Sequence, residues 1–430
     1  MKILKLTTAL LALSAVSAHA GGVGGGNADS NWTIYGWQNY SYEMVDLEGG
    51  REYDRIQGNA ANIGFSASID TGVMMGGQAV NANMQCEQFT FHNRLTSSGW
   101  CNRNSKLSLS GSFGVVMVGQ WLLPYNEMVA QWVDPFYDAG DDSHSSIMGS
   151  VGHGTLFYNG GTFPLGGGDN DFNYGTGATD LGFNRRQEET IQYFSPNMNG
   201  FTFRIATSSR AGGDTAVAND KEVDPRIWSM GAAYEKTLDN GDSAWFAITY
   251  QKHDEWAARA VTSEDSEDES WRIAGRYIHQ WGNGSFSRLS AMWENLEYDV
   301  EGFGDTDDDE AGFQTGWSLF NGVEGGDLKF DRDAWMISGI HNFGNGLDAR
   351  FSYMRAEEYD CDSGCVDDDT DASAVNLGLF YTMPAGTGLR LTYSEVDDED
   401  NANYAFAISG VGAGTGNKAK MYGIGMVQWF

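Results

Sequence analysis

The chain has 430 residues, and 59 Asp and Glu against 26 Lys and Arg give a formal net charge of −33 at pH 7. Such a charge repels phosphate backbones and argues against nucleic acid as a partner. Glycine is abundant (57) and proline scarce (6), but aromatic residues reach 13 %, which disordered glycine-rich chains lack. The composition therefore predicts an ordered protein with many short strands and tight turns.

Residues 1–20 have the pattern of a cleaved signal peptide. Two lysines precede an apolar run at 9–16, and Ala-His-Ala at 18–20 forms a small-residue cleavage site. The run is too short to span about 30 Å of hydrocarbon, which disfavours a membrane anchor. The mature protein is therefore predicted to begin near Gly21 and to be exported. Nothing downstream approaches 18 apolar residues in a row, so no membrane-spanning helix is predicted.

The four cysteines of an exported chain are predicted to form disulfides. Of the three connectivities, the sequence-local one pairs Cys86 with Cys101 and Cys361 with Cys365. A zinc site is the weaker interpretation, because no His or further Cys stands at zinc-ligand spacing.

From Trp32 onward, runs of about ten residues alternate between apolar and polar, which is the period of a β-strand. In SAWFAITYQ (243–251), for example, Phe246, Ile248 and Tyr250 share one face. Sixteen strands are predicted, at about 31–44, 60–69, 77–87, 103–111, 114–121, 186–195, 200–209, 226–236, 242–253, 270–281, 284–298, 333–343, 346–358, 372–382, 388–396 and 418–430.

The connections between these strands alternate in length. Tight Gly- and Asn-containing turns, such as 239–241, 282–284 and 344–346, alternate with long polar loops. Short turns at one end and long loops at the other are typical of a transmembrane β-barrel, which in bacteria has an even number of strands. The last strand is predicted to close against the first, since an open edge in lipid would leave backbone groups unpaired. The predicted fold is an all-β, sixteen-stranded antiparallel transmembrane barrel.

Four stretches in the right order then carry a resemblance to the Gram-negative trimeric porins, over nearly the whole mature chain. TIYGWQNYSYE resembles their first strand, NRNSKLSLSGSFGVVMVGQ the fourth and fifth, RRQEETIQYFSPNMNGF the sixth and seventh, and YGIGMVQWF the closing strand. The resemblance implies a homotrimer of water-filled pores in the outer membrane.

The resemblance also implies that the third extracellular loop, here 122–185, folds inward and narrows the pore. A long loop in a compact domain is expected to be functional. Porins of this family set loop acids against basic residues on the barrel wall. The corresponding residues here are the loop acids Glu127, Asp134, Asp138, Asp141 and Asp142, and the wall residues Arg103 and Arg186. Asn62 stands where the family usually has an arginine.

Five further arginines fall on the polar faces of predicted strands: Arg272, Arg276, Arg288, Arg350 and Arg390. The pore interior is their expected side, because Arg facing lipid costs about 2–4 kcal/mol at the midplane. They form either a solvated inner wall or a selectivity ladder for anionic or zwitterionic solutes. Acidic extracellular loops would repel anions, so the net ion preference stays open.

Acidic clusters are predicted in the extracellular loops at 264–269, 305–310, 367–371 and 397–400. They are solvated loops or, alternatively, places where carboxylate oxygens could hold Ca²⁺ and bridge lipopolysaccharide phosphates. No other cofactor is expected. Aromatic residues near the predicted constriction form either interfacial girdles or a stacking slide for sugars: Trp121, Tyr125, Trp132, Phe136 and Tyr137.

The predicted function is an outer-membrane porin for passive diffusion of small hydrophilic solutes and ions. The first alternative is a substrate-specific channel on the same barrel, for organic acids or sugars. The second is a secreted, acidic, all-β calcium-binding protein. Enzyme activity is not expected, because His144 and His153 lack an acid partner at a catalytic spacing.

Overall fold

The computed structural model describes residues 23–27, 30–59, 61–90, 100–137, 139–149, 182–208, 226–255, 265–303, 326–363, 367–384, 386–407, 409, 411–414 and 416–430. Within them, nineteen strands belong to one antiparallel sheet. They are β1 (Val23–Asn27), β2 (Ser30–Leu47), β3 (Glu52–Gly58), β4 (Asn62–Met75), β5 (Gln78–Phe89), β6 (Ser105–Gly111), β7 (Gly114–Leu122), β8 (Arg186–Phe194), β9 (Phe201–Ser208), β10 (Arg226–Thr237), β11 (Ser243–Asp254), β12 (Asp265–Gln280), β13 (Phe286–Phe303), β14 (Gly326–Asn342), β15 (Leu347–Ala356), β16 (Asp360–Ser363), β17 (Ala372–Thr382), β18 (Thr387–Asp398) and β19 (Lys418–Trp429).

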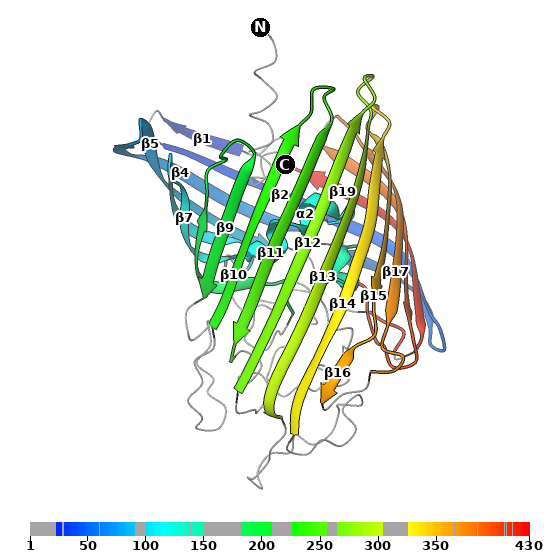
Figure 1. Cartoon of the computed structure of the whole chain (residues 1–430). Helices are drawn as coiled ribbons and strands as arrows, with labels where there is room; N and C mark the ends of the chain where they lie inside the picture. The colour runs from blue at the N-terminus through cyan, green and yellow to red at the C-terminus, as the bar shows by residue number, and fades with distance from the viewer. Residues whose placement is uncertain are drawn as a thin grey trace.

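Sixteen wall strands close into a barrel, as the sequence predicts (Figure 1). β3 and β4 both pair with β2 and form one wall strand with a break between them. β15 and β16 likewise both pair with β14. β1 is not counted as a wall strand, because it pairs only with the first residues of β2, beyond the point where β19 ends.

The seam of the barrel lies between the last strand and the first. β19 pairs with β2 from Ala419 opposite Leu47 to Trp429 opposite Trp37. Phe430 extends the seam, because its N–H donates to the Gly36 carbonyl and its carbonyl accepts from the Gly36 N–H, at 3.0 and 3.1 Å. The predicted closing strand is therefore confirmed, and no backbone edge is left open there.

Alternate residues of each wall strand face opposite sides of the barrel. On β19 the outward Tyr422, Ile424 and Met426 are 49 %, 60 % and 55 % exposed, whereas the inward Ala419 and Met421 are buried. Across the barrel, the outward face is apolar and the inward face carries most of the buried polar and charged side chains. This is the pattern of a barrel with an apolar surround and a polar interior.

Short turns at one end connect the wall strands, as predicted. Gly241, Gly282 and Gly346 have φ of 89°, 81° and 88°, a conformation that glycine adopts without strain. At Gly346 a Cβ would also lie 2.5 Å from the Thr382 carbonyl oxygen, so no other residue fits there. The turn glycines thus fix the hairpins that set the strand order.

The structure corrects some predicted boundaries. The predicted acidic loop cluster 264–269 is instead largely strand, because β12 begins at Asp265. There the outward Glu267 and Glu269 bind Lys252 and the Tyr250 hydroxyl, and the inward Asp268 is buried. Likewise, 397–398 of the cluster 397–400 end β18.

The predicted disulfide between Cys86 and Cys101 is present, with Cα atoms 4.9 Å apart. Cys361 is also disulfide-bonded; its predicted partner, Cys365, lies outside the described residues, as do the predicted signal peptide 1–20 and the acidic cluster 305–310. In the described part of the chain, no helix is long and apolar enough to cross a membrane.

Candidate functional site

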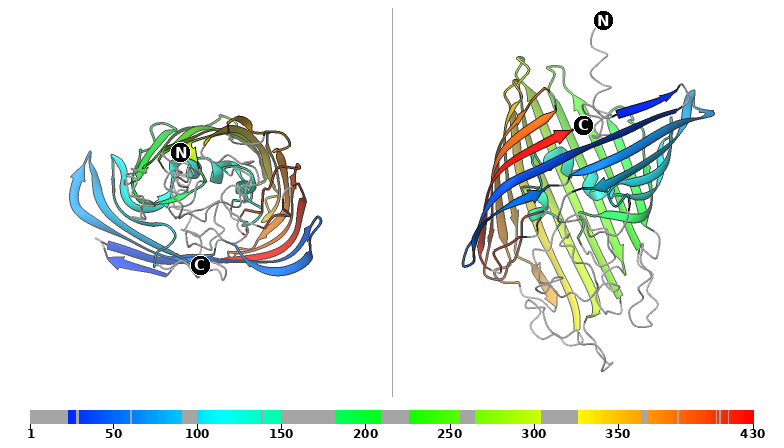
Figure 2. Two further views of the ribbon diagram at one scale, coloured as in Figure 1. Left: turned by 90° about the horizontal axis from the view of Figure 1, so that it is seen from below. Right: turned by 180° about the vertical axis from the view of Figure 1, so that it is seen from behind.

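The segment that follows β7 carries the helices of the described chain, within the predicted constriction loop. They are α1 (Pro124–Glu127), α2 (Ala130–Val133) and the 3₁₀ helix η3 (His144–Ser146). Pro124 occupies the first turn of α1, where a missing N–H costs nothing. Seen along the barrel, this helical segment lies inside the ring of strands (Figure 2, left). Residues 150–181 lie outside the described part, so the inward fold of the loop as a whole stays a prediction.

The segment 123–149, called here the lumen segment, follows the inner wall from β10 to β18. Its hydrogen bonds to inward side chains are, in chain order, Tyr125 N–H to Ser229 on β10, Thr249 on β11 to the Tyr125 carbonyl, Ser338 on β14 to the Val133 carbonyl, Arg350 on β15 to the Pro135 carbonyl, and Ser394 on β18 to Asp142. It therefore lines about half of the wall.

Apolar contacts strengthen this attachment. Met128, Val129, Val133, Ile147 and Met148 of the lumen segment are buried in one cluster with small and flexible residues of the wall. Alanines and methionines such as these leave room for a second layer inside the barrel. The burial of these side chains removes apolar area from water and favours the docked position.

Glu294 on β13 is the centre of a fully buried ion-pair network. Its carboxylate accepts from Arg272 at 2.6 Å, from Arg332 at 2.7 Å and from the Gly149 N–H at 2.6 Å. The Tyr125 hydroxyl donates to it at 3.0 Å, and burial raises the pKa of Tyr125, which keeps that hydroxyl protonated. Both ends of the lumen segment are thus held by one carboxylate.

Most of the predicted arginine ladder binds the lumen segment. Arg288 donates to the Val133 carbonyl at 3.3 Å, and Arg350 to the Pro135 carbonyl at 2.8 Å. Arg272 donates to the Asn126 side chain at 3.3 Å. The five arginines face inward, and guanidinium groups among them also hold the loop backbone and side chains. The choice between a solvated inner wall and a selectivity ladder stays a prediction.

Arg276 and Arg390 complete that set. Arg276 lies 4.8 Å from the ring centroid of Trp132 on α2 and binds Glu235 at 2.7 Å. Arg390 is buried beside Asp142 of the lumen segment. Both side chains stabilise the docked segment through charge or ring contacts.

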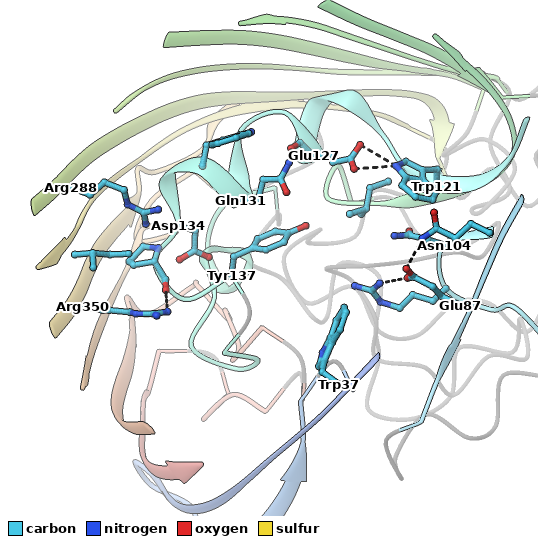
Figure 3. A pocket seen from close by; sticks show the side chains of 16 residues that line it. Trp37, Glu87, Asn104, Trp121, Glu127, Gln131, Asp134, Tyr137, Arg288 and Arg350 are labelled. Atoms are coloured by element: carbon cyan, nitrogen blue, oxygen red, sulfur yellow. Dashed lines mark hydrogen bonds and ion pairs between the residues drawn. The ribbon is translucent and has the colours of Figure 1, made fainter. Parts of the chain in front are cut away.

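A pocket of about 290 Å³ lies beside the lumen segment and is lined by that segment and by inward residues of the wall (Figure 3). On the loop side it is lined by Glu127, Gln131, Trp132, Asp134, Pro135 and Tyr137. On the wall side it is lined by Trp37, Gln85, Glu87, Arg103, Asn104, Trp121, Leu122, Arg288, Ile340 and Arg350. We call it the constriction pocket.

The two family-matched arginines lie at or behind the wall side of the constriction pocket. Arg103 lies just before β6, forms an ion pair with Glu87 and places its guanidinium 4.8 Å from the Trp37 ring centroid. Arg186, at the start of β8, is buried and donates to Asn104 at 2.7 Å. Arg103 therefore lines the pocket, and Arg186 supports a residue that does. Arg103 was expected inside a strand that in fact begins at Ser105.

The acids of the constriction pocket are each paired. Glu127 accepts from the Trp121 indole N–H at 3.1 Å and binds Arg204 at 2.5 Å. Asp134 accepts from the His144 N–H at 2.8 Å and lies 2.9 Å from its Nδ1.

The pairing of His144 with Asp134 corrects the prediction that this histidine lacks an acid partner. The other ring nitrogen of His144 lies 3.3 Å from Asn126 Oδ1. Both nitrogens are thus occupied, and the ring is fully buried. His144 therefore holds the loop conformation here. His153 lies outside the described residues.

Asp141 and Asp142 lie away from the constriction pocket, near the seam of the barrel. Asp141 binds Arg55 on β3 at 2.5 Å. Burial raises the pKa of Asp142 to about 6, with Arg390 and the Ser394 hydroxyl opposing the shift. The structure therefore divides the predicted acids between two places. Asp138 lies outside the described residues.

The predicted aromatic slide is only partly available. Trp132 and Tyr137 are half-buried and line the constriction pocket, joined by the buried Trp121 and by Trp37. Tyr125 and Phe136 are fully buried and serve to attach the segment. Of the five candidate rings, three therefore line the pocket and two do not, and sugar stacking on them stays a prediction.

Several residues of the site escaped the sequence analysis. Arg332 lay one residue before a predicted strand, and Arg55 lies on β3, which was not predicted, so parity could not place them. Glu87 and Glu294 lay on the polar faces of predicted strands, and strand parity was a signal that could have found them. The described residues contain no group of three or more His, Cys, Asp or Glu side chains arranged to hold a metal ion. Calcium binding at cluster 305–310 stays a prediction.

Comparisons with known proteins fit this architecture. The family model for Gram-negative porins matches residues 7–430. Among solved structures, the anion-selective porin from Comamonas acidovorans has a TM-score of 0.62 at 18 % identity, covering 94 % of this chain and all of that one. OmpT, an outer membrane protein of Vibrio cholerae, has a TM-score of 0.56 at 12 % identity, with 94 % and 99 % covered.

Salmonella typhi OmpF has a TM-score of 0.54 at 13 % identity, with 95 % and 100 % covered. Among curated protein sequences, no significant match was found. At these identities the solved structures show the fold, and the family model spans nearly the whole chain. The chain therefore belongs to the Gram-negative porin family and forms an outer-membrane channel for the passive diffusion of solutes.

Proposed function

We propose that the protein is a general diffusion pore for small hydrophilic solutes and ions, and that solutes pass through the constriction pocket. One observation carries this proposal. The lumen segment is fixed against the wall from β10 to β18, and the constriction pocket separates it from β5 to β7. Loop acids line one side of the pocket and wall arginines the other, so a solute crosses a transverse field without a covalent step.

The proposal includes export and assembly. Residues 1–20 act as a signal peptide that is cleaved, and the mature chain assembles as a homotrimer. The trimer is supported by the likeness to OmpT of Vibrio cholerae, for which one structure is described as a trimer form. The outward apolar residues meet outer-membrane lipid, and the acidic outer ends of β12 to β14 lie at the level of lipopolysaccharide.

Single-channel recording in planar bilayers tests the proposal. The purified protein in KCl should give ohmic conductance in three equal steps, which sugars small enough to pass do not block. The reversal potential in a salt gradient shows whether the pore prefers cations, because its acids determine the selectivity, or anions, because its arginines do. A protein that inserts and gives no channels would contradict the proposal, and single steps would contradict the trimer alone.

A second candidate function is a channel specific for organic acids, and the charge distribution of the constriction pocket favours it. The three acids of the pocket are paired with Arg103, Arg204 and His144. Arg288 instead donates to a backbone carbonyl and makes no ion pair with any described residue. A solute carboxylate could therefore bind Arg288 next to the rings of Trp132 and Tyr137. Block of the KCl current by millimolar benzoate, but not by glucose, would favour this candidate.

A further inference from the structure

The connection between β18 and β19 is called here the last loop, and the structure describes its residues 399–407, 409, 411–414 and 416–417. Extracellular loops usually lie at the surface. In this loop, however, Ala402, Tyr404, Phe406 and Ala407 are at most 1 % exposed. Burial of that extent requires that other parts of the chain cover them.

These buried residues of the last loop pack against the interior of the barrel. Ala402, Tyr404 and Phe406 share one apolar cluster with Val133 and Ile147 of the lumen segment and with inward wall residues. The loop is tightly folded, since the Phe406 N–H donates to the Val411 carbonyl at 3.0 Å and a Cβ on Gly412 would lie 2.7 Å from the Tyr404 carbonyl oxygen. It is thus a compact element inside the barrel.

Polar contacts attach the last loop at two distant points of the wall. On β14, Arg332 donates to the Tyr404 hydroxyl at 2.7 Å and also to the Ile147 carbonyl at 3.2 Å. On β3, Arg55 donates to the Ser409 hydroxyl at 3.0 Å. Between β14 and β3 the wall contains β15, β17, β18, β19 and β2. A loop that reaches both strands spans that part of the lumen.

The same contacts join the last loop to the lumen segment. Asp141 accepts from the Ser409 N–H at 2.5 Å through Oδ1 and from Arg55 at 2.5 Å through Oδ2. Its backbone carbonyl accepts from the Ala407 N–H at 3.3 Å. Arg332 and Arg55 thus each bind both loops, and the two loops are held as one unit.

We propose that the last loop is a second constriction element, which occupies the lumen between β14 and β3 and sets the size limit for solutes together with the lumen segment. This inference rests on the proposed function, because it concerns the same channel. It assigns the predicted loop acid Asp141 a positioning role, and it extends the set of pore-defining residues to Arg55, Arg332 and Tyr404.

The test replaces residues 403–413 by Gly-Gly-Ser and compares the variant with the unaltered protein. Heat-modifiable mobility in detergent first establishes that the barrel forms. Conductance of an electrolyte-filled pore rises with its open cross-section, so we expect about a twofold increase in single-channel conductance. In a swelling assay, liposomes that contain the variant should also admit larger oligosaccharides than liposomes that contain the unaltered protein. A folded variant with unchanged conductance and size limit would overturn the inference.

Point variants keep the test decisive if the replacement does not fold. Phe406→Ala removes a buried ring of the last loop, and its matched control is Phe343→Ala, because Phe343 is 46 % exposed in a turn at the other end of the barrel. We expect larger conductance and frequent current fluctuations for Phe406→Ala and unaltered traces for Phe343→Ala. Identical traces for both would overturn the inference. A native protein without channels would instead refute the proposed function itself.

Discussion

Glu294→Gln should release the lumen segment from the wall. The substitution keeps the shape of the side chain but removes the charge shared by Arg272 and Arg332, which are at most 1 % exposed. Loss of one partner of a buried ion pair costs about 3–5 kcal/mol, because the remaining charges stay buried without compensation. The amide NH₂ would in addition face N–H donors where the carboxylate now accepts.

The matched control is Glu297→Gln on the same strand. Glu297 faces outward, its side chain is 38 % exposed, and it lies 3.6 Å from Lys329. Such an exposed pair contributes at most about 1 kcal/mol. Unfolding in guanidinium, followed by tryptophan fluorescence in detergent, gives the difference in free energy. Limited proteolysis reports whether cleavage within 123–149 accompanies it. Equal stability and equal cleavage of the two variants would refute the anchoring role of Glu294.

Three further predictions concern selectivity, pH and the disulfide. Arg350→Gln should shift the reversal potential towards cation preference. Arg355→Gln should leave it unaltered, because Arg355 faces outward on β15 and its side chain is 40 % exposed; an equal shift in both would contradict a role for the pocket charge. Because burial raises the pKa of Asp142 to about 6, unfolding free energy should rise by about 2 kcal/mol as pH falls from 6 to 4, and Asp142→Asn should lose that rise; the same dependence of stability on pH in both proteins would disprove the assignment. Replacing Cys86 and Cys101 by Ser should lower stability by about 3 kcal/mol, because the bridge closes a loop with a sequence separation of 15; equal denaturant midpoints would count against it.

The barrel itself could be predicted because its signals are local. Alternation shows each strand, turn glycines such as Gly241 mark the hairpins, and closure follows from the need to pair every backbone edge in lipid. The glycine-rich β1 has no alternating apolar residues, so it was not found. The acidic start of β12 was missed for a related reason, because its outward residues are charged beyond the apolar band.

The site could be predicted only in part, because its contacts are non-local. Parity placed Arg288 and Arg350 on the polar faces of their strands, but their partners are loop carbonyls, which no side-chain pattern reveals. Likewise, Asp141 was grouped with Asp134 by sequence, although the lumen segment carries the two to different places. The path of a loop through a barrel depends on packing, which sequence spacing does not encode.

Chemical modification of the constriction pocket during single-channel recording tests the central claim most directly. Gln131→Cys places a thiol on the loop side of the pocket, and the matched control Leu377→Cys places one on the outward face, where Leu377 is 49 % exposed. If solutes pass through the pocket, a membrane-impermeant cationic thiol reagent should lower the conductance of Gln131→Cys in discrete steps and reduce its cation permeability, with no effect on Leu377→Cys. Full conductance of Gln131→Cys after complete labelling of the introduced thiol would show that ions take another route.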